Sequence, residues 1–523
     1  MSNTASQNVD PAVVGVRAEN AGILTLQAVV QDIRLKFPTA SKQTPIVLVP
    51  GFSGWGRPLL GAVNYFGGFS DLALTLAAEG YPVIQVRLSP ISSNKERACE
   101  IFEQLTNING ATGFDTPGTT PPTLIPVNYG ALQITAVTPP PPPAQTWQAV
   151  VYGNLPAGWA WSAQNRVIFI CHSQGGNSVR QLLHYMSGRA PQDLAQFGAV
   201  DKQAWVKAVI TLGTPHRGTT ITQAVQGILQ ANPNLEDAAV DFVTSCSFAN
   251  RQDRVFDLGL DHWGFTRLGQ QDTFDTMRQR IRPHVIAWLN GTDNGIHDNS
   301  IAGAGTLNSN TAAYDSPPTY FLTMSFCATT PFPNRTLTTQ DVREFLQLLP
   351  LGGVANFIGL PWLISSFLSW GNWRGATPPL RSVLAWMTDV ANRHLGALGY
   401  FSRIPRPGPQ VPRHDMLPII APFAYAIGGI NVPGEDREPN DGVVNTMSMD
   451  GPQGRVRAAA PGSFAAELNQ VNPQTTAWGP FWHFGSNAAI DHADQLGIFT
   501  DASVNAEVGA MYELFAELAD RIP

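Results

Sequence analysis

Short runs of mostly apolar, β-branched residues recur along the first half of the chain and alternate with segments of helical length. The apolar runs are residues 46–49, 83–86, 167–170 and 208–212. Strands that are apolar on both faces are typical of a parallel sheet buried between two layers of helices. Residues 71–80 and 176–186 lie between such runs and are long enough to form crossover helices. The pattern predicts an α/β fold with a mostly parallel, doubly wound central sheet and helices on both faces.

Three segments depart from this alternation, and we interpret them as insertions within a single elaborated domain over residues 1–523. Residues 107–160 contain TPGTTPP and five consecutive prolines at 139–143, which form polyproline II and cannot enter a helix or a central strand. Residues 219–250 carry apolar positions at helical spacing, and residues 345–400 hold an excess of aliphatic and aromatic residues. We expect the first insertion to be a surface excursion. Each of the other two is either added core or a cover over a site.

The composition excludes several classes of protein. Hydrophobic residues make up 43% and charged residues 14% of the 523 residues, so most of the chain can bury a core. The net charge of −7, without a basic stripe, argues against a nucleic-acid partner. The longest apolar stretch, at 346–370, is interrupted by glycines and prolines, so no transmembrane segment is expected. The four cysteines show no CxxC spacing, and the N-terminus lacks the pattern of a secretory signal.

A serine with the surroundings of a catalytic nucleophile follows the third apolar run. That run leads into CHSQGG at 171–176, and a helical pattern follows. In a nucleophile elbow, the serine lies on a tight strand-to-helix turn that needs small residues two positions before and after it. Gly175 meets this need after Ser173, and Cys171 is small enough to meet it before. The amide of Gln174, at the helix N-terminus, would then face an oxyanion. The alternative is an ordinary glycine-rich turn.

A second glycine-rich loop, PGFSGWG at 50–56, follows the first apolar run. In a hydrolase sheet of this kind, the corresponding loop supplies the second amide of the oxyanion hole. The N–H of Phe52 is the candidate donor. By itself the pattern more often marks a simple tight turn.

A serine hydrolase of this architecture needs an acid and then a histidine later in the chain. Five of the ten histidines follow at a sufficient distance: His297, His394, His414, His483 and His492. Asp441 lies in the turn signal NDGVVN at 440–445, and His492 lies in a polar loop before the C-terminal helix. We therefore pair Asp441 with His492.

These motifs resemble those of the thermophilic bacterial lipases of true-lipase family I.5, the Geobacillus and Staphylococcus type, from about Thr44 to the C-terminus. The matching blocks are PGFSGWGR at 50–57, YFGG at 65–68, ISSNKERACE at 91–100, CHSQGG at 171–176, TPHRGTT at 214–220, LDHWGF at 260–265, NDGVVNTMSMDGP at 440–452 and DH at 491–492. The resemblance implies the α/β-hydrolase fold with inserted lid and cap elements. It implies Ser173, Asp441 and His492 as a catalytic triad. It also implies the amides of Phe52 and Gln174 as the oxyanion hole.

The chain departs from this family at a structural zinc site, which the family builds from two aspartates and two histidines. Asp261 matches one aspartate, Glu96 replaces the other, and residues 100–170 contain no histidine. A tetrahedral site cannot be completed from these positions, so no zinc is expected unless a residue such as His262 supplies an unforeseen ligand. Glu96 and Asp261 are predicted to pair with arginines or to be solvated.

Two further departures concern calcium and the oxyanion loop. Asp494 matches one acid of the family's calcium site, but Phe499 stands in the place of the second, and Asp501 could substitute only through a bulged loop. Calcium is therefore possible, and no cofactor is required. Pro50 stands where the family has a histidine, which predicts a stiffer loop with altered hydrogen bonding beside the oxyanion hole.

The resemblance implies a serine carboxylic-ester hydrolase of lipase type, acting on triacylglycerols and other long-chain acyl esters at a lipid–water interface. It implies a mobile lid helix at 219–250, whose apolar face would carry Ile221, Val225, Ile228 and Leu229. Leu235, Val240, Phe242 and Val243 continue the apolar content to about residue 245. The insertion at 345–400 would then extend the acyl groove or form added core. Two alternatives stay open: a polyester or lactone hydrolase with the same triad, and a non-catalytic binding protein of the same fold. The family is secreted, although the chain shows no recognisable leader.

Overall fold

The computed structural model describes the greater part of the chain. The described residues are 15–107, 113–119, 121–133, 140–231, 233–311, 319–331, 410–413, 415–417, 420–428, 430, 432–468 and 481–523. The predicted insertion at 345–400 lies outside the described residues, as do Pro139, His394 and His414. The same applies to the side chains of Ile228 and Leu229.

The centre of the fold is a sheet of eight strands in the order β11-β12-β8-β7-β6-β1-β2-β5. The strands are β1 (Ile46–Val49), β2 (Val83–Gln85), β5 (Val150–Tyr152), β6 (Val167–His172), β7 (Val206–Leu212), β8 (Tyr320–Phe326), β11 (Val456–Ala458) and β12 (Phe481–Asn487). Neighbouring strands pair in parallel except β5, which joins β2 antiparallel at one edge. The four apolar runs of the sequence correspond to β1, β2, β6 and β7, and the predicted parallel sheet is confirmed.

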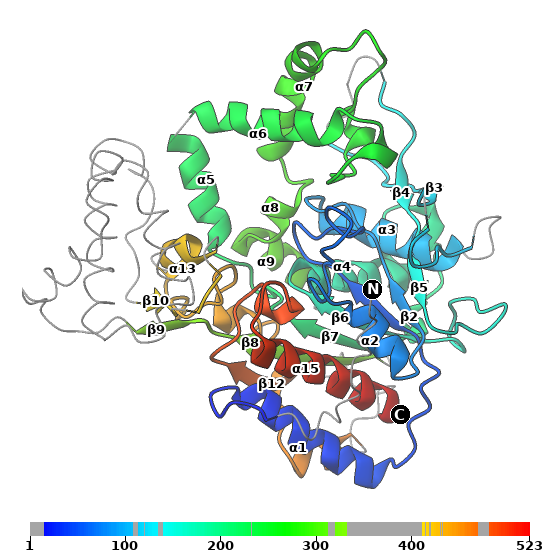
Figure 1. The fold of residues 1–523 in the computed structure, drawn as a ribbon, viewed down its shortest axis with the longest axis vertical. Coiled ribbons are helices and arrows are strands. Elements are labelled where there is room, and N and C mark those ends of the chain that lie inside the picture. The colour runs from blue at the N-terminus through cyan, green and yellow to red at the C-terminus, as the bar shows by residue number, and fades with distance from the viewer. Residues whose placement is uncertain are drawn as a thin grey trace, which may run out of the picture.

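Helices cover both faces of the sheet, because successive residues of each buried strand point to opposite sides. On one side, Ile46 and Leu48 of β1 share a core with α1 (Ala21–Lys36), α2 (Leu72–Ala78) and α15 (Ala502–Arg521). On the other side, Val47 and Val49 pack with α3 (Asn94–Thr106) and α4 (Gln174–His184). In Figure 1, α1 lies below the strands and α3 lies above them.

The segment 107–160 is more than a surface excursion. It contributes β5 to the edge of the main sheet, and β3 (Leu124–Pro126) pairs antiparallel with β4 (Gln145–Trp147) beside it. Further elements are α8 (Gly295–Asp298), α9 (Ile301–Asn310), β9 (Thr329–Pro331), β10 (Gln410–Pro412), α13 (Ala421–Gly428) and α14 (Ser463–Glu467).

The segment 219–250 forms two helices, α5 (Ile221–Ala231) and α6 (Pro233–Ser247), where the sequence predicted one. Together with α7 (Phe274–Leu289), they project away from the sheet at the top of Figure 1. Val240 and Val243 of α6 are buried in a separate apolar cluster with residues of α7. Phe242, which the sequence placed in the same apolar series, is 51% exposed. One face of α6 is therefore core and another meets solvent.

None of the helices in the described part of the chain is both long and apolar enough to cross a membrane.

Candidate active site

Ser173 lies at the sharp turn between β6 and α4. Its backbone has φ 53° and ψ −130°, a region that non-glycine residues rarely adopt and that functional sites retain at a cost in energy. The turn is tight: a Cβ on Gly175 would lie 2.6 Å from the carbonyl oxygen of Val49. Cys171, at the other position that needs a small residue, is completely buried. The predicted strand–turn–helix arrangement around Ser173 is therefore present.

Asp441 and His492 meet on neighbouring loops. Nδ1 of His492 lies 2.7 Å from Oδ2 of Asp441, and the main-chain N–H of His492 donates to the carbonyl of Asp441 at 3.0 Å. The Asp441 side chain is fully buried, and its Oδ1 accepts hydrogen bonds from the amides of Val443 and Val444 at 3.0 and 2.8 Å. The carboxylate is thus oriented by two amides, and its second oxygen fixes the imidazole.

The loop that carries His492 reaches the serine turn through His172, the residue before Ser173. Nε2 of His172 lies 3.1 Å from the carbonyl oxygen of His492, and the two imidazole centroids are 4.5 Å apart. By contrast, His483 lies within β12 and contacts Thr323 of β8. The tertiary structure therefore brings His492 to the serine turn.

The loop after β1 packs directly on the nucleophile turn. A Cβ on Gly51 would lie 2.6 Å from Cβ of Ser173, so only glycine allows this approach. A Cβ on Gly295 of α8 would lie 2.8 Å from the ring of Phe52 and 3.0 Å from Oε1 of Gln174. Phe52 and Gln174 therefore gather beside α8. Gln174 is the first residue of α4, where helix amides have no partner within the helix and carry partial positive charge.

The sequence pattern did not identify Gln495, which donates from Nε2 to Oδ2 of Asp441 at 2.7 Å. It also missed Arg97, whose buried guanidinium donates to the carbonyls of Pro50 and Ser89 and to Oγ of Ser178. Burial lowers the pKa of Arg97 to about 10, so the side chain stays cationic at neutral pH. No local pattern marks either role, although Arg97 lies in the block ISSNKERACE used above.

Tyr65 and His172 were also missed. The phenolic oxygen of Tyr65 accepts from the amide of Gly51 at 2.9 Å and lies 2.8 Å from Nδ1 of His172. Burial, reinforced by His492, holds the pKa of His172 well below its usual range, so its ring is neutral at neutral pH. Burial likewise raises the pKa of Tyr65, which keeps its proton.

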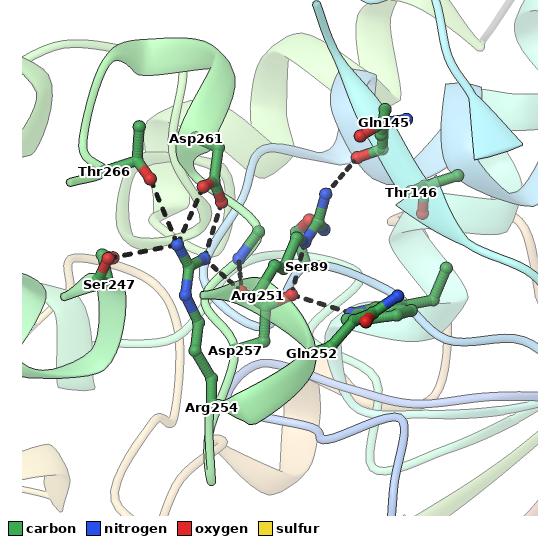
Figure 2. A network of polar contacts seen from close by, with 12 residues as sticks. Ser89, Gln145, Thr146, Ser247, Arg251, Gln252, Arg254, Asp257, Asp261 and Thr266 are labelled. Carbon is green, nitrogen blue, oxygen red and sulfur yellow. Dashed lines mark hydrogen bonds and ion pairs between the residues drawn. The ribbon is translucent and has the colours of Figure 1, made fainter. Parts of the chain in front are cut away.

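Figure 2 shows the surroundings of Asp261, one of the two acids considered for zinc. Both carboxylate oxygens of Asp261 bond Arg254, at 2.6 and 2.8 Å, and Arg254 also pairs with Asp257. Burial would raise the pKa of Asp257, but Arg251 and Arg254 lower it to about 2. Asp261 is paired with an arginine, as the sequence predicted.

The prediction for Glu96 was wrong. The Glu96 side chain is fully buried and bonds Nε2 of His262 at 2.5 Å and Nε1 of Trp263 at 3.0 Å, so it meets neither an arginine nor solvent. His262 lies 166 positions away in the chain, and only the fold brings it to Glu96. Glu96 and Asp261 thus have separate partners. Across the described residues, no group of three or more His, Cys, Asp or Glu side chains could hold a metal ion.

The calcium candidates also have protein partners. Burial raises the pKa of Asp494 well above its ordinary value, and repulsion from Asp491 adds to the effect. The Asp491 carboxylate accepts main-chain N–H groups of Leu417, Ala493 and Asp494. Asp501 caps the N-terminus of α15 through Oδ1. Asp491 and Asp494 therefore lie close together, and their carboxylates repel each other.

The sheet order, the serine turn and the loops at the carboxyl ends of β1, β6 and β12 define an α/β-hydrolase fold.

Comparison of the sequence with known proteins also points to lipases. The family model described as the lipase-like C-terminal domain matches residues 151–359. The lipase of Staphylococcus hyicus is 27% identical over 299 residues, which cover 54% of this chain and 40% of that protein. The chain is similar in sequence to the staphylococcal lipases, and it spans about two fifths of the length of the relatives that it matches.

Solved structures support the same fold. The crystal structure of Staphylococcus hyicus lipase matches with a TM-score of 0.56 at 19% identity, over 92% of this chain and 97% of that chain. EstA from Clostridium botulinum matches with a TM-score of 0.52 at 20% identity, over 96% of this chain and 97% of that chain. At sequence identities of 19% and 20%, these matches show similarity of the fold alone.

Proposed function

We propose that this protein is a serine carboxylic-ester hydrolase of lipase type, with triacylglycerols and other long-chain acyl esters as substrates. The observation that carries the proposal is the contact at 2.7 Å between the buried Asp441 carboxylate and the half-buried His492 imidazole, beside the strained turn of Ser173. A carboxylate that orients an imidazole next to a serine turn is the arrangement that activates a hydroxyl for acyl transfer. The similarity to Staphylococcus hyicus lipase supports the same chemistry.

In this mechanism, Oγ of Ser173 attacks the ester carbonyl while Nε2 of His492 takes the hydroxyl proton. His492 then returns this proton to the leaving alcohol, and an acyl–serine intermediate remains. Water, activated by the same imidazole, releases the fatty acid. Asp441 accepts from Nδ1, which leaves Nε2 unprotonated and able to act as the base.

The negative charge that develops on the carbonyl oxygen would be stabilised by the amides of Phe52 and Gln174. The N-terminus of α4 adds its partial positive charge at this position. Arg97 supports the loop by donating to the carbonyl of Pro50. Because proline has no N–H, Pro50 itself offers the loop only this carbonyl for hydrogen bonding.

The helices α5 and α6 occupy the segment in which the sequence predicted a lid. We propose that they cover the acyl groove in water and expose it at a lipid surface. Phe242 supports this role, because it is a large apolar side chain that is 51% exposed on α6.

The proposed steps use only side chains and main-chain amides of this chain. If calcium binds, Asp491 and Asp494 are the carboxylates that would hold it, in a structural role. Thermal unfolding with calcium and with a chelator tests this: a site raises the midpoint with the ion present.

A fluorophosphonate probe tests the proposed function. We expect the protein to be labelled rapidly, and Ser173→Ala to abolish both labelling and hydrolysis, with a loss in turnover of about 10⁴–10⁶-fold. A non-catalytic binding protein would not be labelled. Rates on p-nitrophenyl esters of increasing acyl length, emulsified triacylglycerol, a lactone and a polyester film would then separate a lipase from the other ester hydrolases.

A further inference from the structure

Three hydrogen bonds form a continuous chain from the oxyanion loop to the loop that carries His492. The amide of Gly51 contacts the hydroxyl of Tyr65 at 2.9 Å, the hydroxyl contacts Nδ1 of His172 at 2.8 Å, and Nε2 of His172 contacts the carbonyl of His492 at 3.1 Å. Tyr65 is 4% and His172 2% exposed, so bulk water does not compete for these bonds.

The direction of each bond follows from the groups involved. The carbonyl of His492 can only accept, so Nε2 of His172 carries the proton. In the neutral ring, Nδ1 must then accept, and the hydroxyl of Tyr65 donates to it. The remaining lone pair of that hydroxyl accepts from the amide of Gly51. All three hydrogen bonds are therefore donated in the same direction, from the amide of Gly51 at one end to the carbonyl of His492 at the other.

The two ends of this chain belong to different parts of the reaction site. Gly51 directly precedes Phe52, whose amide would bind the oxyanion, and Gly51 packs against Ser173. The imidazole of His492 would be the general base. The spacing between oxyanion donor and base must be held closely during acyl transfer, because small displacements cost large factors in rate.

We propose that Tyr65 and His172 are positioning residues that fix the oxyanion loop relative to His492. This inference rests on the proposed function, since it assigns the two residues to the same ester-hydrolysing site. They touch neither substrate nor reacting atoms, and they act through Gly51 and His492. Their loss should therefore lower kcat and leave KM for a short ester nearly unchanged.

Tyr65→Phe is the decisive variant, because the ring remains packed without its hydroxyl. Trp55 and Phe66 contact the Tyr65 ring edge-to-face, with centroids 5.2 and 5.1 Å away. The change leaves a buried amide and a buried imidazole nitrogen without their shared partner. Loss of such a bond corresponds to about a tenfold change in rate when it acts in the transition state.

Tyr512→Phe provides a matched control. Tyr512 is also fully buried, its ring lies 6.3 Å from Phe66, and its hydroxyl has no hydrogen-bond partner among the described residues. Tyr512→Phe removes a phenolic oxygen from the same apolar core and leaves the three hydrogen bonds in place. The control should therefore keep kcat within about twofold of wild type, well inside the tenfold effect expected at Tyr65.

The experiment measures kcat and KM for p-nitrophenyl butyrate per active site titrated with fluorophosphonate, alongside thermal unfolding. We expect Tyr65→Phe to lose about tenfold in kcat with KM within about twofold. A purely structural hydroxyl would lower the thermal midpoint and the titrated fraction but leave kcat per titrated site unchanged, and that result would overturn the proposal.

A double variant tests whether the two residues act in series. If they do, Tyr65→Phe combined with His172→Phe loses no more kcat than His172→Phe alone, because loss of His172 removes two of the three bonds and already disconnects Tyr65 from His492. Multiplied losses would mean independent effects and would contradict the chain. Failure of the proposed function is distinguishable: the wild-type protein would then show neither fluorophosphonate labelling nor Ser173-dependent ester hydrolysis, whatever the Tyr65 variant does.

Discussion

Asp441 and His492 are joined twice, once through the side chains and once through the main chain. Oδ2 of Asp441 bonds Nδ1 of His492 at 2.7 Å, while the carbonyl of Asp441 accepts the main-chain N–H of His492 at 3.0 Å. The second bond holds the two loops together independently of the carboxylate. Changes to the Asp441 side chain can therefore affect the imidazole without separating the loops.

Asp441→Asn is expected to lower turnover by about 10⁴-fold with little change in the fold. Oδ1 of Asp441 accepts hydrogen bonds from two main-chain amides, so the side-chain oxygen of the asparagine will occupy the position of Oδ1. Its NH₂ group then faces Nδ1 of His492, which must accept, and the proton moves to Nε2. The imidazole is thereby held in the tautomer that cannot take the serine proton. Turnover of a soluble ester and circular dichroism measure the two effects.

Asp450→Asn serves as the control for this change, since Asp450 pairs with Arg217 and touches neither His492 nor Ser173. Full turnover in Asp441→Asn would contradict the assigned triad.

Gly51→Ala should reduce kcat by about a hundredfold or more. The new Cβ would lie 2.6 Å from Cβ of Ser173 and 2.9 Å from the hydroxyl of Tyr65, so the loop must move away from the nucleophile. Gly305→Ala, in α9, is the matched control, because no atom lies within 4 Å of its added Cβ. Kinetics on a short ester check both variants, and equal activity in the two would show that the close approach is unimportant.

Arg254→Met should strongly destabilise the protein, by about 3–5 kcal/mol, because it leaves the Asp261 carboxylate without its bidentate partner. Arg282→Met is the control: Arg282 pairs with Asp237, both are more than 40% exposed, and the expected loss is small because water screens the pair. Denaturant unfolding measures both.

Metal analysis of protein purified without chelator should find no stoichiometric zinc, since the family's ligand set is incomplete here. One zinc per chain would contradict the expectation from the sequence and would direct attention to His262 and Glu96.

The lowered pKa of His483 predicts that the folded protein loses stability in mild acid. Burial, with a smaller effect of Arg217, lowers the pKa of His483 from 6.5 to about 4. Below pH 6.5 the unfolded chain binds a proton that the folded chain refuses until about pH 4, so stability falls as the pH drops through this window. His483 contributes up to about 3 kcal/mol to this fall.

His483→Asn removes the titrating group and keeps an amide near Thr323. Unfolding free energies between pH 4 and 7 should therefore fall less steeply in the variant than in wild type. Identical slopes would mean that His483 titrates normally in the folded protein.

Phe242→Glu tests the lid. The charge should reduce activity on emulsified long-chain esters much more than on soluble short esters, because only the emulsion requires apolar surface at the interface. Stability should change little, since Phe242 is 51% exposed. Val200→Glu is the control, as Val200 is 72% exposed and lies between β6 and β7, outside α5 and α6. Equal losses on both substrates would argue against a lid at α6.

The parts of the site that could be predicted from the sequence are those that depend on local sequence pattern. The run at 46–49 forms β1 with these bounds, and Ser173 lies on the predicted turn, because alternating burial and glycine spacing depend on neighbours a few residues away. Asp441 and His492 were chosen by their order and turn context, and the structure brings them into contact. Their catalytic roles stay predictions.

Three predictions from the sequence differ from the structure, and two of them concern contacts between distant segments. The sequence placed Glu96 with an arginine or in solvent, whereas it meets His262 from 166 positions away. It predicted one helix at 219–250, where the structure forms two. It also treated 107–160 as an excursion, although β5 completes an edge of the main sheet.

By itself, the sequence determined the parallel sheet, the serine turn and the glycine that lets the β1 loop approach it. These features depend on side-chain size and periodicity within single segments. Only the tertiary structure decided which buried polar groups meet: Gln495 with Asp441, and Tyr65 with His172. A buried donor must find an acceptor wherever the packed chain supplies one, and that partner has no fixed distance along the sequence.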